Sequence, residues 1–160
     1  MGIRYIYPEL TYINFALRAV ITKSTYTTVG AIANMTDDDI TTYYGDWRGG
    51  VTSLNAWVMF DFEEIIIIDF IIAYIGAYCS AGSFSCNLYC EYSNDGLAWT
   101  TAQSCLGVTA SMGWGYCNIS VSNIIGRYVR FRLSGTNTIA ATWEFGVFET
   151  KLNVLGSSIF

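Results

Sequence analysis

The chain of 160 residues contains no histidine and only one proline, Pro8. The missing imidazole excludes Ser-His-Asp and Cys-His catalysis and histidine-ligated zinc, because imidazole is the usual general base and the commonest metal ligand. Charged residues make up only 13% of the chain, and its 8 Lys and Arg against 13 Asp and Glu give a net charge of −5. This balance argues against binding to nucleic acid or to an anionic membrane, since both require a basic face.

Targeting signals are also lacking. The N-terminal stretch MGIRYIYPEL has no basic region followed by an apolar core and a small-residue cleavage site, so it does not predict a signal peptide. The apolar run Ile65–Tyr78 is too short to cross a membrane, and Asp69 interrupts it. We expect no transmembrane segment, and a protein that works at an extracellular surface or in a virion, or otherwise in the cytoplasm.

The five cysteines, at positions 79, 86, 90, 105 and 117, include no CxxC pair. The spacing therefore does not indicate a zinc ribbon or a thioredoxin-type site. Their odd number leaves at least one free thiol if disulfides stay within the chain. Cys86 and Cys90 share strand parity with Leu88, so we expect them to face the core. Buried free thiols are the favoured interpretation, and disulfides are the alternative.

What the chain does contain is apolar and aromatic: hydrophobic residues make up 52% and aromatic residues 16%. Such residues suit pleated surfaces, and the 15 glycines supply turns. Ala56–Phe62, Ser85–Tyr92, Gly126–Leu133 and Thr142–Thr150 alternate as strands do, while Ile65–Tyr78 predicts a strand pair or a strand covered on both faces. The residues predicted to face the core include Val58, Phe60, Phe62, Val129, Phe131 and Leu133. The pattern predicts an all-β sandwich or jelly roll.

Five stretches, in order, carry a family resemblance: Asn14–Leu17 with Ser24, Asn34–Tyr44, Trp57–Phe62, Glu91–Trp99, and Arg127–Arg130 with Glu144–Phe148. Together they resemble the discoidin, or coagulation-factor C-type, domain over roughly residues 14 to 149. The resemblance implies an all-β, eight-stranded antiparallel jelly-roll β-sandwich of the galactose-binding-domain-like type. It divides the chain into an apolar N-terminal arm (1–13), the sandwich (14–150) and a C-terminal tail (151–160).

The sequence departs from the family pattern at several positions. Asp38 stands where the family usually has Gly, although Asp tolerates positive φ and the turn can survive. Tyr44 replaces the usual Trp, and Glu63 replaces the Gly that follows the Asp-Leu pair. The family's frequent disulfide between the chain ends is absent, because no Cys lies near either terminus.

The acidic run at 37–39 is the first candidate site. Calcium prefers several hard oxygen ligands, including carboxylates and carbonyls. The resemblance implies a structural Ca²⁺ whose ligands are Asp37, Asp39, Thr42 and Glu144, with the carbonyl of Asn34 as a further candidate. The alternative is a solvated acidic turn in which the aspartates bond the local backbone.

The second candidate site is the set of loops at one end of the sandwich, where the resemblance places ligand binding. The matching stretches are Ser24–Gly30, Tyr43–Asn55 and Gly76–Ser83. An indole can stack on the apolar face of a sugar, and charged side chains can bond its hydroxyls. The candidate ligand-binding residues are Tyr26, Tyr44, Asp46, Trp47, Arg48 and Tyr78. Alternatively, Trp47 and Tyr44 close the end of the core, and Trp114 carries the same ambiguity.

Two further features concern partners. Arg127, Arg130 and Arg132 are interpreted as a solvated strand face with Arg127 paired to a carboxylate, in preference to an anion-binding patch. The segments 1–13 and 151–160 are unusually apolar for tails. They either pack on their own sandwich or contact other subunits, and we favour self-association or partner-subunit contact.

Taken together, these features predict a non-catalytic surface ligand-binding module, with a glycan as the expected ligand, stabilised by calcium if the acidic loop binds it and built into a larger assembly. The alternative is a structural subunit of a virion, fibre or filament that does not bind sugar. Glu63 and Glu64 resemble a glycosidase carboxylate pair in type, but nothing in the sequence places them across a cleft.

Overall fold

The computed structural model describes residues 13–14, 19–37 and 39–154. Its elements are β1 (Ile13–Asn14), β2 (Val20–Lys23), β3 (Thr27–Val29), the 3₁₀ helix η2 (Ile32–Met35), β4 (Tyr44–Ser93) and β5 (Thr100–Val154). Most of the two predicted arms, the Asn14–Leu17 stretch apart from Asn14, and Asp38 lie outside the described residues. Over the described ranges, no helix is long and apolar enough to cross a membrane.

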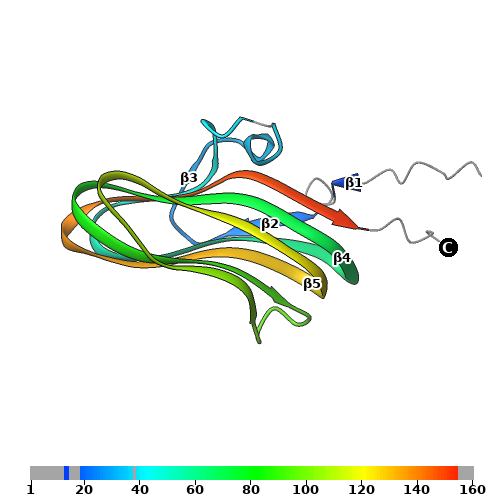
Figure 1. The fold of residues 1–160 in the computed structure, drawn as a ribbon. Helices are drawn as coiled ribbons and strands as arrows, with labels where there is room; N and C mark the ends of the chain where they lie inside the picture. Colours follow the sequence, from blue (N-terminus) through cyan, green and yellow to red (C-terminus); the bar gives the residue numbers. More distant parts are fainter. Residues whose placement is uncertain (1–12, 15–18, 38, 155–160) are drawn as a thin grey trace, which may run out of the picture.

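The long strands β4 and β5 pair in antiparallel fashion and each folds back on itself to contribute to two layers (Figure 1). In the first layer, residues 70–79 of β4 pair on both edges with β5, namely with 113–122 and 143–153. In the second layer, residues 83–93 of β4 also pair on both edges with β5, namely with 100–111 and 128–137. β3 extends the first layer and β2 extends the second, through pairing with β4. The predicted all-β antiparallel fold is confirmed.

The predicted count of eight strands is not confirmed, because the strands β4 and β5 continue through the corners of the sandwich without a break. β4 runs for 50 residues and β5 for 55. β4 turns between the layers near Gly50 and Gly82, whose φ angles of 71° and 73° lie in the left-handed region that glycine enters without steric penalty. The turns at 24–27, 48–53, 79–83 and 137–142 lie at one end of the sandwich, which we call the loop end.

The core lies between the two layers and follows the alternation predicted from the sequence. Val58, Phe60, Val129, Phe131 and Leu133 are fully buried, and Phe62 is 9% exposed. Phe60 and Phe131 meet edge to face across the two strands, with ring centroids 5.9 Å apart. Each such side chain contributes about 1.5–3 kcal/mol by leaving water.

The apolar run Ile65–Tyr78 lies within the single strand β4, so the predicted alternative of a strand pair is wrong, and so is the alternative of a strand covered on both faces. Its inward residues, including Ile68, Ile71 and Ile75, are fully buried. Its outward residues Ile65, Ile67 and Ile72 are 59%, 60% and 47% exposed. Burial within this sandwich therefore does not explain the apolar outer face.

Both states of cysteine that the sequence left open occur. Cys105 and Cys117 form a disulfide, while Cys79, Cys86 and Cys90 are buried free thiols, with Cys86 and Cys90 on the core side as predicted. Burial raises the pKa of the Cys86 thiol to about 12, which keeps it protonated and unreactive at neutral pH. The disulfide joins the outermost segments of the two layers and so closes one side of the sandwich.

The arginine-rich strand is more structured than predicted. Arg127 pairs with Asp61 through two hydrogen bonds of 2.8 and 2.9 Å, which confirms its predicted carboxylate partner. Arg130 and Arg132 both bond the carboxylate of Glu91, so they form a half-buried network and not a freely solvated face. Their guanidinium groups also lie 3.8 Å and 4.2 Å from the ring centres of Trp99 and Tyr89, respectively. The guanidinium groups of Arg130 and Arg132 are therefore already bound to a carboxylate and packed on aromatic rings.

One departure from the family pattern has a visible consequence. Glu63, which replaces a family Gly, has φ of 64°. A side chain in this left-handed region costs about 1–2 kcal/mol relative to the right-handed conformation. The backbone N–H of Glu63 donates to Asp61 Oδ1 at 2.8 Å, and this bond holds the turn in its strained form.

Candidate ligand-binding loops

A buried ion pair fastens the first turn of the loop end to the sandwich. Asp46 is fully buried, and its Oδ1 lies 2.6 Å from the Nζ of Lys23. Ser24 donates its hydroxyl to the same carboxylate, and its backbone N–H donates to the Trp57 carbonyl at 3.0 Å. Lys23 also donates to the Ser24 carbonyl at 2.8 Å. The turn between β2 and β3 is therefore held on β4 by a network of charged and neutral hydrogen bonds.

Three of the predicted ligand-binding residues, Tyr26, Trp47 and Arg48, lie at the loop end, and we call them the Trp47 cluster. The Arg48 guanidinium lies over the Tyr26 ring, 4.8 Å from its centroid. Trp47 precedes Arg48 in β4 and is 38% exposed. Such a cation–π contact is worth about 0.5–1 kcal/mol at an exposed site and keeps the arginine in place. Because consecutive strand residues point to opposite faces, the Trp47 indole lies on the outer face of the first layer, while Arg48 and Tyr26 lie on the other side of the strand.

The remaining predicted ligand-binding residues lie elsewhere. Tyr44 is only 8% exposed and belongs to the core, and Asp46 is buried in its ion pair. Because strand alternation turns both side chains inward, they lie beneath the surface and not on it. Tyr78 is half-buried on the outer face of the first layer, two strand segments away from Trp47.

That outer face carries a group of packed aromatic side chains, of which the sequence pattern pointed only to Tyr78 and Trp114. In register across the layer lie Trp47, Glu144, Tyr78 and Trp114. The Trp114 ring packs against Tyr43 at 5.1 Å, Tyr78 at 5.5 Å and Tyr116 at 6.0 Å between centroids. Tyr74 and Tyr116 stack at 4.8 Å. The overlooked signal is the i, i+2 spacing of Trp114 with Tyr116, which places both rings on one face.

Glu144, a predicted calcium ligand, lies within this aromatic surface. It accepts a hydrogen bond from the Tyr43 hydroxyl. Burial and the adjacent Glu144 carboxylate raise the pKa of Tyr43, so the phenol stays protonated and remains a donor. The Asn34 amide donates to the Tyr43 carbonyl at 3.2 Å. Two predicted ligands of the metal site, Asn34 and Glu144, are thus both linked to Tyr43.

The acidic loop itself is organised by its own hydrogen bonds. Asp37 accepts from the Asp39 N–H at 3.0 Å and from the Thr42 hydroxyl at 2.8 Å. Asp39 accepts from the N–H and hydroxyl of Thr41 at 2.9 and 2.6 Å, and these bonds lower its pKa. This geometry matches the backbone-bonding alternative. Among the residues that the structure describes, no three Cys, Asp or Glu side chains gather closely enough to hold a metal ion.

Comparisons with known proteins add the family context. A family model described as the F5/8 type C domain matches residues 20–145. No curated protein matches the chain.

Several solved structures share the fold. The chitosan-binding module 1 of a chitosanase/glucanase from Paenibacillus sp. IK-5 is 18% identical, with 89% of this chain and 98% of that chain covered and a TM-score of 0.54. The module CpGH89CBM32-4 of Clostridium perfringens, in complex with GlcNAc-α-1,4-galactose, is 16% identical, with 91% and 96% covered and a TM-score of 0.52. A GH29 fucosidase from Ruminococcus gnavus, in complex with fucose, is 18% identical over 91% of this chain but only 27% of its own, with a TM-score of 0.53. At these identities the likeness concerns the fold.

Proposed function

The chain belongs to the F5/8 type C, or discoidin, domain family, and we propose that it is a non-catalytic module that binds glycans at its loop end. The observation that carries this proposal is the exposed indole of Trp47 at the loop end, where the next residue, Arg48, is held against Tyr26. An indole face covers the apolar C–H face of a sugar ring, while a guanidinium donates to its hydroxyls. Consecutive residues of β4 at the loop end therefore supply both kinds of contact that a sugar requires.

The support beneath this cluster favours a preformed site. The Lys23–Asp46 ion pair and the Ser24 hydrogen bonds hold the loop before any ligand arrives. A preorganised site loses less conformational entropy on binding, which matters for a ligand that makes few contacts. The ligands of two similar modules, chitosan and GlcNAc-α-1,4-galactose, support a sugar as the ligand class.

The positions of Asp46, Glu63 and Glu64 support the proposed non-catalytic role. The chain contains no histidine, and Asp46 at the loop end is committed to its ion pair. Glu63 and Glu64 are adjacent residues in the turn that follows residues 53–61, away from Trp47. Glycosidases need two carboxyl groups about 5–9.5 Å apart across the scissile bond, and adjacent residues on one turn do not face each other in this way.

A glycan array followed by isothermal titration calorimetry tests the proposal. We expect at least one neutral or weakly charged glycan to bind, and Trp47→Ala to weaken that binding at least tenfold, as truncating a central aromatic contact typically does. Leu97→Ala serves as the control, because Leu97 is 86% exposed in a distant turn. A blank array from correctly folded protein contradicts the proposal.

Calcium remains a separate proposal for the acidic loop. Asp37, Asp39 and Thr42 already share one short loop, and their carboxylate, hydroxyl and carbonyl oxygens are of the type that calcium prefers. Binding requires the Asp37 and Asp39 carboxylates to exchange some of their present hydrogen bonds. The ion would then stabilise the loop next to Tyr43 and leave the glycan contacts unchanged.

Assembly is the second candidate function, and one observation favours it. Ile67 and Ile125 are cross-strand neighbours on the outer face, and together with Ile65 they are 57–60% exposed. Exposed apolar side chains that lie together commonly mark an interaction surface. We propose that the module attaches to a larger extracellular or virion structure through this end, which leaves the loop end free. If the larger structure is built from copies of this chain, a size-exclusion mass equal to the 17.8 kDa monomer at high concentration contradicts the proposal.

A further inference from the structure

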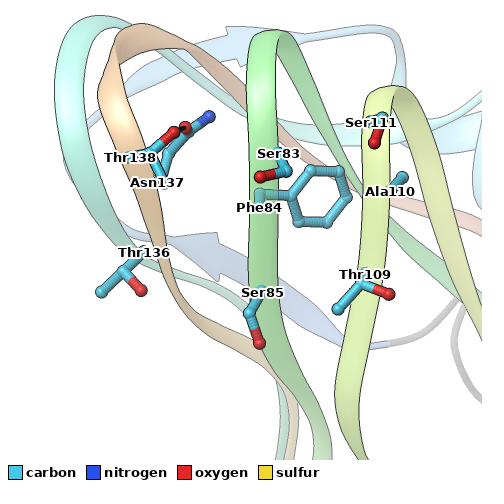
Figure 2. Close-up of a pocket in the computed structure, with 9 residues that line it drawn as sticks. All are labelled: Ser83, Phe84, Ser85, Thr109, Ala110, Ser111, Thr136, Asn137 and Thr138. Atoms are coloured by element: carbon cyan, nitrogen blue, oxygen red, sulfur yellow. Dashed lines mark hydrogen bonds between the residues drawn. The ribbon is translucent and has the colours of Figure 1, made fainter.

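An open groove of about 530 Å³ crosses three neighbouring strand segments beside the loop end (Figure 2). Figure 2 shows hydroxyl side chains from β4 and from two separate parts of β5 around it. The six hydroxyl residues that line the groove are Ser83, Ser85, Thr109, Ser111, Thr136 and Thr138. The groove is distinct from the Trp47 cluster, which lies on the first layer.

The hydroxyl groups follow from the strand register. Ser83 pairs with Ser111, and Ser85 lies between Thr109 and Thr136. Neighbouring strands lie about 4.8 Å apart, and alternate residues of one strand lie about 6.8 Å apart on the same face. The side chains therefore form a regular grid on the outer face of the second layer. We call this grid the hydroxyl ladder.

The ladder continues beyond the groove. A second hollow of about 240 Å³ shares Ser85 and Thr136 with the first, and the cross-strand pair Asn87 and Ser134 lies at its far side. From Ser83 to Asn87 the ladder spans about 14 Å at 3.4 Å per residue. Farther along the same strands, Glu91 and its arginine partners lie on the outer face in place of the hydroxyl side chains. The ladder is thus an elongated surface with a defined end.

One end of the ladder is held rigidly. Asn137 is 9% exposed, and its side-chain amide donates to the Ala81 carbonyl at 2.8 Å. Its side-chain oxygen accepts from the Ile139 N–H at 3.2 Å and from the Thr138 hydroxyl at 3.3 Å. These bonds tie the turn at 137–142 to the turn at 79–83 and fix the strands on which the ladder hydroxyls lie.

The chemistry of the lining selects a class of ligand. No charged side chain is present among the residues that line the two hollows. A hydroxyl group both donates and accepts hydrogen bonds, which matches the hydroxyls of a sugar. An anionic or cationic ligand would lose hydration here without gaining a counter-charge. The length of the ladder exceeds what one sugar ring can cover.

From this arrangement we propose that the hydroxyl ladder binds a stretch of an uncharged glycan chain, as an extended surface on the second layer that is separate from Trp47. The inference rests on the proposed glycan-binding function and deepens it, because it names neutral oligosaccharides as the preferred ligands. Short sugars bind at the Trp47 cluster, whereas longer neutral chains gain affinity by contacting successive hydroxyl groups along the ladder.

The test compares chain length, charge and ladder variants by isothermal titration calorimetry. The probes are cellohexaose, mannohexaose, laminarihexaose and N-acetylchitohexaose, their monosaccharides, and the acidic hexagalacturonate. We expect at least one neutral hexasaccharide to bind more tightly than its monosaccharide and than hexagalacturonate. The double variant Ser85→Ala/Thr136→Val removes two ladder hydroxyls. It should weaken the binding of that hexasaccharide about tenfold, as expected for two lost hydrogen bonds, and leave the affinity for the monosaccharide unchanged.

Thr22→Val/Ser122→Ala is the matched control, since both residues are exposed strand positions outside the ladder. Amide chemical-shift mapping of the wild-type protein with the same hexasaccharide supplies a readout independent of variant folding, with shifts expected at Ser85 and Thr136. Binding that depends on Trp47 but neither shifts the ladder amides nor responds to the ladder variant overturns this inference alone. Failure of every hexasaccharide, while a monosaccharide binds, also overturns it alone. Failure of all sugars overturns the proposed function as well.

Discussion

Substitution of Lys23 by Met should destabilise the domain strongly, because it leaves the Asp46 carboxylate without its cation. Asp46 is fully buried and lies 2.6 Å from Lys23 Nζ, whose side chain is 14% exposed. Removing one partner of a buried pair typically costs 3–5 kcal/mol, since the other charge remains desolvated. Asp46 still accepts a hydrogen bond from Ser24, so we expect a loss near the lower end, about 3 kcal/mol.

The double variant Lys23→Met/Asp46→Leu separates this effect from loss of packing. Apolar residues of similar volume often replace a buried ion pair at little net cost. The Ser24 hydroxyl then loses its acceptor, which costs about 1–3 kcal/mol if no other partner is found. We therefore expect the double variant to be no less stable than Lys23→Met, although it carries one more substitution.

Urea unfolding followed by tryptophan fluorescence measures these differences. With an m-value of about 2 kcal/mol/M, a loss of 3 kcal/mol shifts the midpoint by about 1.5 M. A shift below about 0.5 M for Lys23→Met would refute the reasoning, because the buried carboxylate would then be stable without its partner. So would additive losses in the double variant, since the two residues would then act independently.

Three further predictions concern the rest of the molecule. Replacing Cys105 and Cys117 by serine removes a crosslink between residues 12 apart and should lower the free energy of unfolding by about 3 kcal/mol in urea, whereas an unchanged midpoint would show that the bond is not formed. Burial raises the pKa of Glu91, but hydrogen bonds from its two arginine partners outweigh this effect and hold the pKa below the ordinary 4.5. The stability that Glu91 contributes is therefore present above pH 4.5 and is lost as the pH falls through the lower folded-state pKa. Glu91→Gln should flatten this acid limb in pH-dependent melts, and a parallel acid limb in the variant contradicts the assignment. If the acidic loop binds calcium, millimolar Ca²⁺ should raise the melting temperature relative to EDTA and Asp37→Asn should abolish the difference, whereas identical melts in Ca²⁺ and EDTA leave the loop a hydrogen-bonded turn.

Local patterns were sufficient to predict the layers of the sandwich. Alternation over Ala56–Phe62 and Gly126–Leu133 correctly identified the inward residues, because one face of each segment packs in the core. The same rule would also have predicted that Tyr44 and Asp46 share an inward parity with Trp47 between them. The family resemblance instead suggested that all three were surface residues.

The site required information that no local pattern contains. The burial of Asp46 depends on Lys23, which lies on a different strand. Glu144 meets Tyr43 across 101 residues of sequence, and the hydroxyl ladder combines three segments that only the register brings together. Cysteine connectivity is undetermined by sequence for the same reason, since several pairings are compatible with five cysteines.

The most direct test of glycan binding at the loop end is a ¹H–¹⁵N titration of the wild-type protein with the best ligand from the array. We predict that the indole N–H of Trp47 and the amides around Tyr26 and Arg48 shift in a saturable manner. Shifts confined to the opposite end, around Ile65 and Ile125, or no saturable shift at the Trp47 indole, would contradict the account.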